Sequence, residues 1–201
     1  MVRAWLTALF LTLGLALATL GSAWASGWPP TERIVTYSVS GADGRAIYDD
    51  IGRKGPRITE AQRPVIAHMT FDLKWGRDYK KTGAGCVLTR VQPFLTITYT
   101  LPKAEGVSGE LARKWQVFAA GIEVHERQHG AYARMLAEEI LAQTRDLTTA
   151  SDNANCDGLR AAVQVEVADA FSRYKARNLE FETREMSAGG NVHQLILGLV
   201  Q

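Results

Sequence analysis

Apolar and polar residues alternate through the first half of the chain, which is the pattern of strands that bury one face. Four stretches show this alternation, at residues 35–39, 65–75, 86–91 and 94–101, and glycine or proline separates them. We expect these strands to form an antiparallel sheet with turn-rich links. The link at residues 41–64 carries a short apolar patch that predicts a single helical turn in a surface loop.

Beyond Pro102 the apolar spacing changes to three and four residues, the period of an amphipathic helix. The first helical stripe follows Ser108 as a cap, and its members are Leu111, Trp115, Phe118, Ile122, His125, His129, Tyr132, Leu136 and Ile140. A second stripe follows a polar link in which Ser151 or Asp152 can cap the helix. Its members are Cys156, Leu159, Val163, Val167, Ala170, Tyr174 and Phe181.

Two long helices joined by a short link are expected to pack antiparallel, with the sheet against them. The predicted fold is therefore α+β, an N-terminal antiparallel sheet packed on two long antiparallel helices, and zincin-like. Gly189 and Gly190 are expected to end regular structure near the C-terminus.

The N-terminal segment has the features of a secretory signal peptide. Arg3 provides a positive charge, residues 6–20 are uncharged and apolar, and Ala23-Trp24-Ala25 gives the small residues of a cleavage site. We predict cleavage after Ala25, leaving residues 26–201 as one domain, mainly β over 26–104 and mainly α over 105–201. The alternative is a retained membrane anchor, since the run is just short of the ~20 residues that span a bilayer. Localisation would be secreted or periplasmic, without a membrane association after cleavage.

The net charge and the cysteine content limit the possible partners and the cellular compartment. The chain has 23 basic and 21 acidic residues, and this net charge of +2 argues against nucleic acid as a partner. Its only two cysteines, Cys86 and Cys156, favour one disulfide in an oxidising compartment. Such a bond would close a loop of about 70 residues and stabilise the fold by roughly 4 kcal/mol. Two thiolates contributing to a metal site are the alternative.

The chemistry of the chain lies in His125-Glu126-Arg127-Gln128-His129, an HExxH motif on the first helix. Residues i and i+4 share a helix face, so both imidazoles can bind one Zn²⁺. Glu126 is rotated by roughly 100° from His125 and can act as general base toward a water molecule without binding the ion. The alternative, two core histidines flanking a solvated glutamate, would leave ring nitrogens without hydrogen-bond partners.

The order of features also resembles DUF922, a bacterial family described as secreted zinc-dependent proteases. The similarity covers nearly all of the mature chain and rests on Tyr37-Ser38-Val39-Ser40-Gly41, Gly55-Pro56, Trp75, Cys86, Leu101-Pro102, Trp115, the HExxH motif and Cys156. The resemblance implies a zinc-dependent peptidase with a protein or peptide substrate, and it implies nothing about the identity of that substrate.

The third metal ligand is left open by the sequence. The resemblance implies a histidine in a Tyr-Asp-x-x-Thr-x-His-Gly segment after the second helix, but here Ser187 holds that position. The acidic residue of the segment is kept as Glu182, which we take as the third ligand. Other candidates are Glu185, Glu166 and His193, and a carboxylate or imidazole from any of them suits zinc.

Several other polar residues have weaker assignments. His68 alternates with the polar face of its strand and is expected to face solvent. Tyr99 and Tyr132 can either donate a hydrogen bond to a scissile carbonyl or simply pack in the core. The strand at residues 94–101 could pair with extended substrate if it lies at a sheet edge.

Three functional hypotheses follow. The first is a zinc hydrolase, most concretely a metallopeptidase with Glu126 as general base. The second is a metal-binding protein whose peptidase activity has lapsed, and the third is a partner-binding envelope domain.

Overall fold

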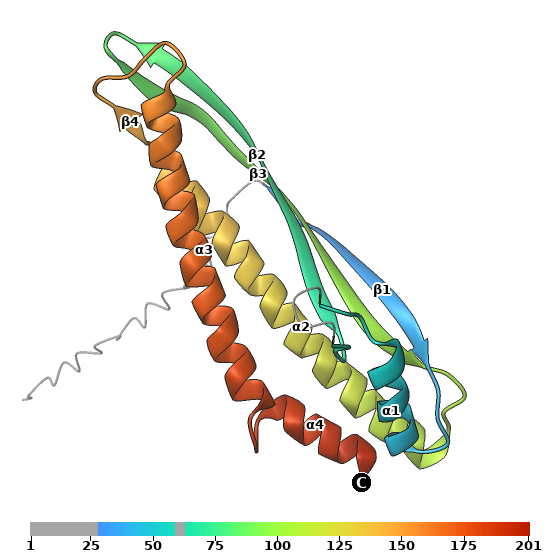
Figure 1. The fold of residues 1–201 in the computed structure, drawn as a ribbon. Coiled ribbons are helices and arrows are strands. Elements are labelled where there is room, and N and C mark those ends of the chain that lie inside the picture. The colour runs from blue at the N-terminus through green and yellow to red at the C-terminus, as the bar shows by residue number, and fades with distance from the viewer. Residues whose placement is uncertain (1–27, 59–62) are drawn as a thin grey trace, which may run out of the picture.

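A long sheet and two long helices lie side by side and form an elongated molecule (Figure 1). The computed structural model describes residues 28–58 and 63–201; the proposed signal peptide falls outside them. Its elements, in chain order, are β1 (Thr31–Val39), α1 (Gly44–Lys54), β2 (His68–Thr82), β3 (Gly85–Ala104), α2 (Gly109–Thr144), β4 (Thr148–Thr149), α3 (Asp157–Met186) and α4 (Asn191–Val200). The fold is α+β, as the sequence predicts.

The sheet is mixed, so the prediction of a purely antiparallel sheet is wrong. Its strand order is β1-β3-β2, with β4 attached to β3. β2 and β3 form an antiparallel hairpin, whereas β1 is parallel to β3. The chain reverses between β1 and β2 and again between β2 and β3, so β1 and β3 run the same way. Because β1 pairs with β3 instead of β2, this pair is parallel.

The two stretches predicted at 86–91 and 94–101 are one continuous strand, β3, that passes through Pro93. Proline has no amide hydrogen to donate to a neighbouring strand. Pro93 is opposite Trp75 on β2, and β1 begins to pair with β3 only at Thr96. The strand therefore has one neighbour at Pro93, which is the setting in which a sheet tolerates proline.

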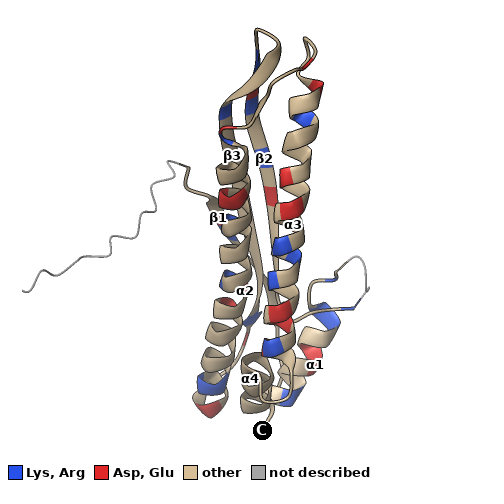
Figure 2. Cartoon of the chain, turned by 90° about the vertical axis from the view of Figure 1, so that its left-hand side faces the viewer, with Lys and Arg blue, Asp and Glu red and all other residues tan. Residues whose placement is uncertain are grey.

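The two long helices run antiparallel along the sheet (Figure 1). α2 begins after Ser108, which occupies the N-cap position as predicted, and extends for 36 residues. α3 begins later than the predicted cap, at Asp157, but Asp152 still accepts hydrogen bonds from the backbone N–H groups of Gly158 and Leu159. Along α3, basic and acidic side chains are interspersed without a segregated patch of either sign (Figure 2).

Two helical segments differ from the sequence expectation: α1 is longer than the single turn predicted, and the expectation that Gly189 and Gly190 end regular structure is wrong. α1 has 11 residues, more than one turn, and buries Ile47 and Ile51. α4 resumes regular structure directly after Gly190 and lies against α2. The close approach needs Gly121, because a Cβ there would lie 2.4 Å from a methyl group of Leu195. Within the described part of the chain, no helix has both the length and the apolar character of a membrane crossing.

The predicted disulfide between Cys86 and Cys156 is confirmed, with the two Cα atoms 5.7 Å apart. It joins the start of β3 to the residue preceding α3, at the end of the molecule that carries the β2–β3 turn. Leu88, Leu159 and Val163 pack around the buried sulfur atoms. The disulfide thus anchors α3 to the sheet at one end.

Candidate metal centre

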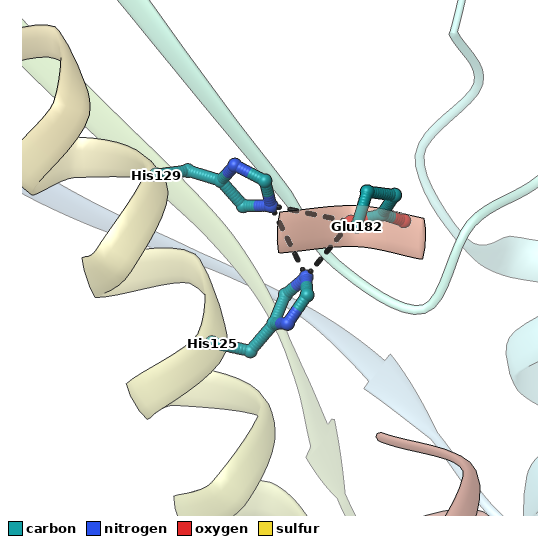
Figure 3. A group of neighbouring side chains, drawn as sticks. All are labelled: His125, His129 and Glu182. Atoms are coloured by element: carbon teal, nitrogen blue, oxygen red, sulfur yellow. Dashed lines mark hydrogen bonds and ion pairs between the residues drawn. The ribbon is translucent and has the colours of Figure 1, made fainter. Parts of the chain in front are cut away.

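Three potential metal ligands converge between α2 and α3. His125 and His129 lie one turn apart on α2, and their Nε2 atoms are 3.1 Å from each other. The Oε2 atom of Glu182, on α3, is 3.2 Å from the His125 Nε2 and 3.3 Å from the His129 Nε2 (Figure 3). Among the described residues, these three form the group of side chains that could hold a metal ion.

The chemistry of the donors fits zinc. In a tetrahedral site with ligand bonds of 2.0–2.1 Å, neighbouring ligand atoms lie about 3.3 Å apart. The three observed separations, 3.1, 3.2 and 3.3 Å, are close to that value. Two imidazole nitrogens and one carboxylate oxygen suit zinc better than calcium or magnesium, which prefer oxygen ligands.

Asn178 orients one of the two imidazoles. The Nδ2 of Asn178 donates to the Tyr174 carbonyl oxygen at 2.8 Å, which leaves its Oδ1 as an acceptor 2.6 Å from the His129 Nδ1. The Nδ1 of His129 must therefore carry the proton, and the lone pair of its Nε2 is directed to the shared site. This is the arrangement in which a second residue fixes the tautomer of a metal-binding histidine.

Phe181 holds the rings of both histidines in place. Its ring stacks on His125 with centroids 4.9 Å apart and meets His129 edge-on at 5.2 Å. The His125 Nδ1 is buried and has no hydrogen-bond partner, and the Oε2 of Glu185 lies 3.9 Å from it. Glu185 thus faces the back of the His125 ring, whereas Glu182 faces the shared site.

Glu126 is buried beside the histidines and stays outside the group of three. It is 6% exposed, and its carboxylate accepts a hydrogen bond from the backbone N–H of Met69 on β2. Burial raises the pKa of Glu126, although both histidines and the Met69 amide act against that shift. A raised pKa makes this carboxylate a better proton acceptor than a solvated glutamate.

The charges of the remaining site groups are coupled. Hydrogen bonds from His125 and His129 lower the pKa of Glu182 to about 2, against the effect of partial burial. Burial alone would lower the pKa of His129, but its hydrogen bonds to Glu182 and Asn178 raise that pKa overall. The negative Glu182 therefore favours a second proton on His129, at the Nε2 that faces it, and a cation bound between these groups can take the place of that proton.

A cavity of about 410 Å³ opens directly onto the three groups. Its walls come from α2, α3 and the segment leading into β2. Its apolar lining residues are Ile58, Val65, Ala67, Met69 and Leu179, and the ring of Tyr174, which carries a hydroxyl, adds to them. Glu182 borders the cavity with 49% of its side chain exposed. The site is therefore accessible, through this cavity, to a molecule of substrate size.

A family model described as "Bacterial protein of unknown function (DUF922)" matches residues 34–190 of the chain. The chain belongs to the DUF922 family. Neither a curated protein nor a solved structure matches it. The family description names no activity, and the geometry of the site is what bears on the chemistry of this DUF922 protein.

The structure separates the four residues considered as third ligand of the DUF922 site. Glu182 lies at the site and Glu185 lies behind His125. His193 is on α4, where its Nδ1 accepts the backbone N–H of Gly189, and Glu166 lies outside the group on α3. Ser187, where the resemblance implied a histidine, donates its hydroxyl to the Arg184 carbonyl at the C-terminus of α3.

Other sequence-based assignments need correction. His68 does not simply face solvent, because its half-buried ring lines the cavity. The strand at 94–101 is not an edge, because β1 and β2 pair with it on both sides. Tyr99 is 1% exposed and packs in the core below Gly130, and Tyr132 packs against Phe181.

Sequence reasoning missed Asn178 and the contact between Met69 and Glu126. The spacing of Asn178 and Glu182 was a usable signal, since residues four apart share a helix face. The Met69 contact had no such signal, because a backbone amide carries no sequence information.

Proposed function

We propose that this protein is a zinc-dependent hydrolase, and most concretely a metallopeptidase. One observation carries the proposal: two imidazole nitrogens and a carboxylate oxygen converge within 3.3 Å, beside a buried glutamate and an open cavity. Three protein ligands with the fourth side accessible is the arrangement of catalytic zinc sites, whereas structural sites are closed by four protein ligands.

When bound, zinc supplies Lewis acidity that makes water a better nucleophile near pH 7 and polarises a carbonyl group. Glu126 acts as the base. It takes a proton as the water oxygen bonds to the carbonyl carbon, and it returns that proton to the amine nitrogen as the C–N bond breaks. The burial of Glu126 and its hydrogen bond from Met69 hold the carboxylate in place for both transfers.

The cavity supports a peptide as the substrate. Its volume of about 410 Å³ and its largely apolar walls are typical of pockets that bind small ligands or the side chains of peptides. Lys175 and His68 add polar groups to this lining. An extended peptide would place one apolar side chain in this space.

Secretion or a periplasmic location is part of the proposal. The disulfide between Cys86 and Cys156 supports an oxidising compartment. The sequence pattern of residues 1–25 supports export, although these residues lie outside the described part of the chain.

A metal-binding or partner-binding protein without hydrolytic activity is the alternative. That reading drew its support from the absence of the family histidine at Ser187. The position of Glu182 weakens this alternative, because Glu182 on α3 can serve as the third ligand in place of that histidine.

Two measurements test the proposal, first the metal content and then hydrolysis. The mature protein should bind one zinc per chain by elemental analysis, and His129→Ala and Glu182→Gln should each lose most of it. Glu185→Gln is the matched control and should keep the metal. Equal zinc in wild type and the His125/His129 double alanine variant would refute the metal site.

Hydrolysis is then measured on a broad panel of unfolded proteins and peptides. Glu126→Gln should retain zinc, because Glu126 is not a ligand, and should lose activity by several orders of magnitude. A wild-type protein that binds zinc and cleaves nothing in the panel would support the non-hydrolytic alternative.

A further inference from the structure

His68 presents an uncommitted polar group to the cavity. It is the first residue of β2, and its half-buried ring lines the same cavity as His125, His129 and Glu182. Within residues 28–58 and 63–201, its ring makes no hydrogen bond and no ion pair. Its ring nitrogens are therefore available to hydrogen-bond a molecule in the cavity.

The backbone around His68 is held from two sides. The residue pairs with Thr100 on β3, and the next amide, that of Met69, donates to the carboxylate of Glu126. A shift of the backbone at His68 would therefore disturb both the pairing of β2 with β3 and the hydrogen bond to Glu126. This holds the backbone that carries the ring in place relative to Glu126, and a group that contacts a reacting bond has to be positioned in this way.

His68 is close to the metal centre without joining it. Electrostatic effects of His129 and Glu182 both reach its ring, yet His68 is absent from the group of ligand atoms that lie within 4.8 Å of one another. Burial lowers the pKa of His68, and His129 lowers it further. The neutral ring has one N–H donor and one acceptor nitrogen.

The other candidate donors are committed or distant. Tyr99 lies under Gly130, Tyr132 packs on Phe181, and neither borders the cavity. Asn178 is engaged with His129. Tyr174 and Lys175 also line the cavity, but they are eight and seven residues before Glu182 on α3. Their backbones therefore lie about 12 and 10 Å from that of Glu182 along the helix axis.

We propose that His68 is a further catalytic residue, whose ring N–H donates a hydrogen bond to the carbonyl oxygen of the peptide bond being cleaved. This inference rests on the proposed function. As water adds to the carbonyl carbon, the C=O electron pair moves to this oxygen and its negative charge grows. A fixed donor stabilises that charge more than it stabilises the uncharged carbonyl of the substrate.

The test compares His68→Ala with Thr70→Ala, an exposed polar position two residues further along the same strand. The first readout is zinc affinity by chelator competition, which should stay within threefold of wild type in both variants. The second is the affinity of the zinc-loaded protein for a phosphinic tetrapeptide with apolar residues on both sides of its tetrahedral, anionic group.

His68→Ala should weaken phosphinic peptide binding by about 10²–10³-fold, the usual cost of losing one such donor, and Thr70→Ala should change it less than threefold. On any substrate found, kcat should fall by a similar factor with KM within threefold. His68→Gln, which keeps an N–H donor, should recover part of the loss. If His68→Ala unfolds the protein, His68→Leu keeps the side-chain bulk and gives the same comparison.

Three results would overturn the inference. Phosphinic peptide binding that is unchanged in His68→Ala would show that the ring does not contact the charged group. A loss of zinc comparable to that of His129→Ala would make His68 a metal ligand. A wild-type protein that takes up neither zinc nor the phosphinic peptide would refute the proposed function, and this inference with it.

Discussion

The Oδ1 atom of Asn178 lies 2.6 Å from the Nδ1 of His129 and fixes which nitrogen of that ring faces the candidate metal centre. The interaction joins α3 to α2 a single turn away from Glu182, so one helix supplies both a candidate ligand and the residue that orients another.

We predict that Asn178→Ala lowers zinc affinity by 10–100-fold, because the His129 ring loses its fixed tautomer and orientation. Competition with a chromogenic chelator measures this change. The control is Gln164→Ala, an exposed residue on the same helix. Equal zinc affinity in Asn178→Ala and wild type would show that Phe181 alone is sufficient to orient the ring.

Gly130, next to His129 of the candidate metal centre, allows α2 to approach β3 closely. A Cβ at this position would lie 2.2 Å from the Tyr99 hydroxyl oxygen, which is buried and has no hydrogen-bond partner. Gly130→Ala should therefore lower the free energy of unfolding by about 1–3 kcal/mol through overpacking. Urea denaturation measures the loss.

The Tyr99→Phe variant provides the matched test for this packing. Removing the hydroxyl should leave stability unchanged or raise it, since the oxygen is unpaired. Combined with Gly130→Ala, it should restore much of the lost stability. Strictly additive effects of the two substitutions would contradict the contact between these residues.

Asp50 should make stability depend on pH in acid. Hydrogen bonds from Lys54, the Ser40 amide and Arg53 lower its pKa from 3.8 to about 2, against the effect of burial. A folded-state pKa below the unfolded value stabilises the protein at pH above 3.8, and this contribution is lost as pH falls toward 2. Asp50→Asn should thus be less stable than wild type from pH 5 to 7.

The difference between the Asp50→Asn variant and wild type should shrink between pH 4 and pH 2. Urea midpoints at each pH give the comparison, and Asp49→Asn, an exposed neighbour, is the control. A difference that is independent of pH across this range would mean that the charge of Asp50 is not the stabilising feature.

The disulfide should account for a large part of the stability. Cys86 and Cys156 are 70 residues apart, and closing a loop of that length stabilises by about 4 kcal/mol in the chain-entropy model. The double serine variant should lose stability of this order in thermal or urea unfolding. Thiol titration of denatured, unreduced protein should find no free thiol, and two titratable thiols would contradict the pairing.

Local patterns predicted the local features of this protein. The 3.6-residue period found both α2 and α3, and the i, i+4 spacing placed His125 and His129 on one face. Strand alternation found the strands but gave no information on their direction, because pairing depends on residues distant in the sequence. The parallel pairing of β1 with β3 was therefore missed.

The third ligand shows the same limit within the site. Glu182 and Glu185 are three residues apart on α3 and differ in sequence only by position. Which of them faces the histidines depends on the rotation and register of α3 against α2, and these are set by packing along the whole helix pair. His68 was misplaced for a related reason, since strand alternation does not describe the first residue of a strand beside a cavity.

The separation of the metal-centre residues has a consequence for when the site exists. His125 and Glu182 are 57 residues apart and meet only when α2 and α3 have paired in the correct register. A slip of α3 by one turn would move Glu182 by about 5.4 Å and leave two histidines alone. On the proposed function, a newly made chain would remain inactive until the helices had docked, which would protect the cell that makes it from premature hydrolysis.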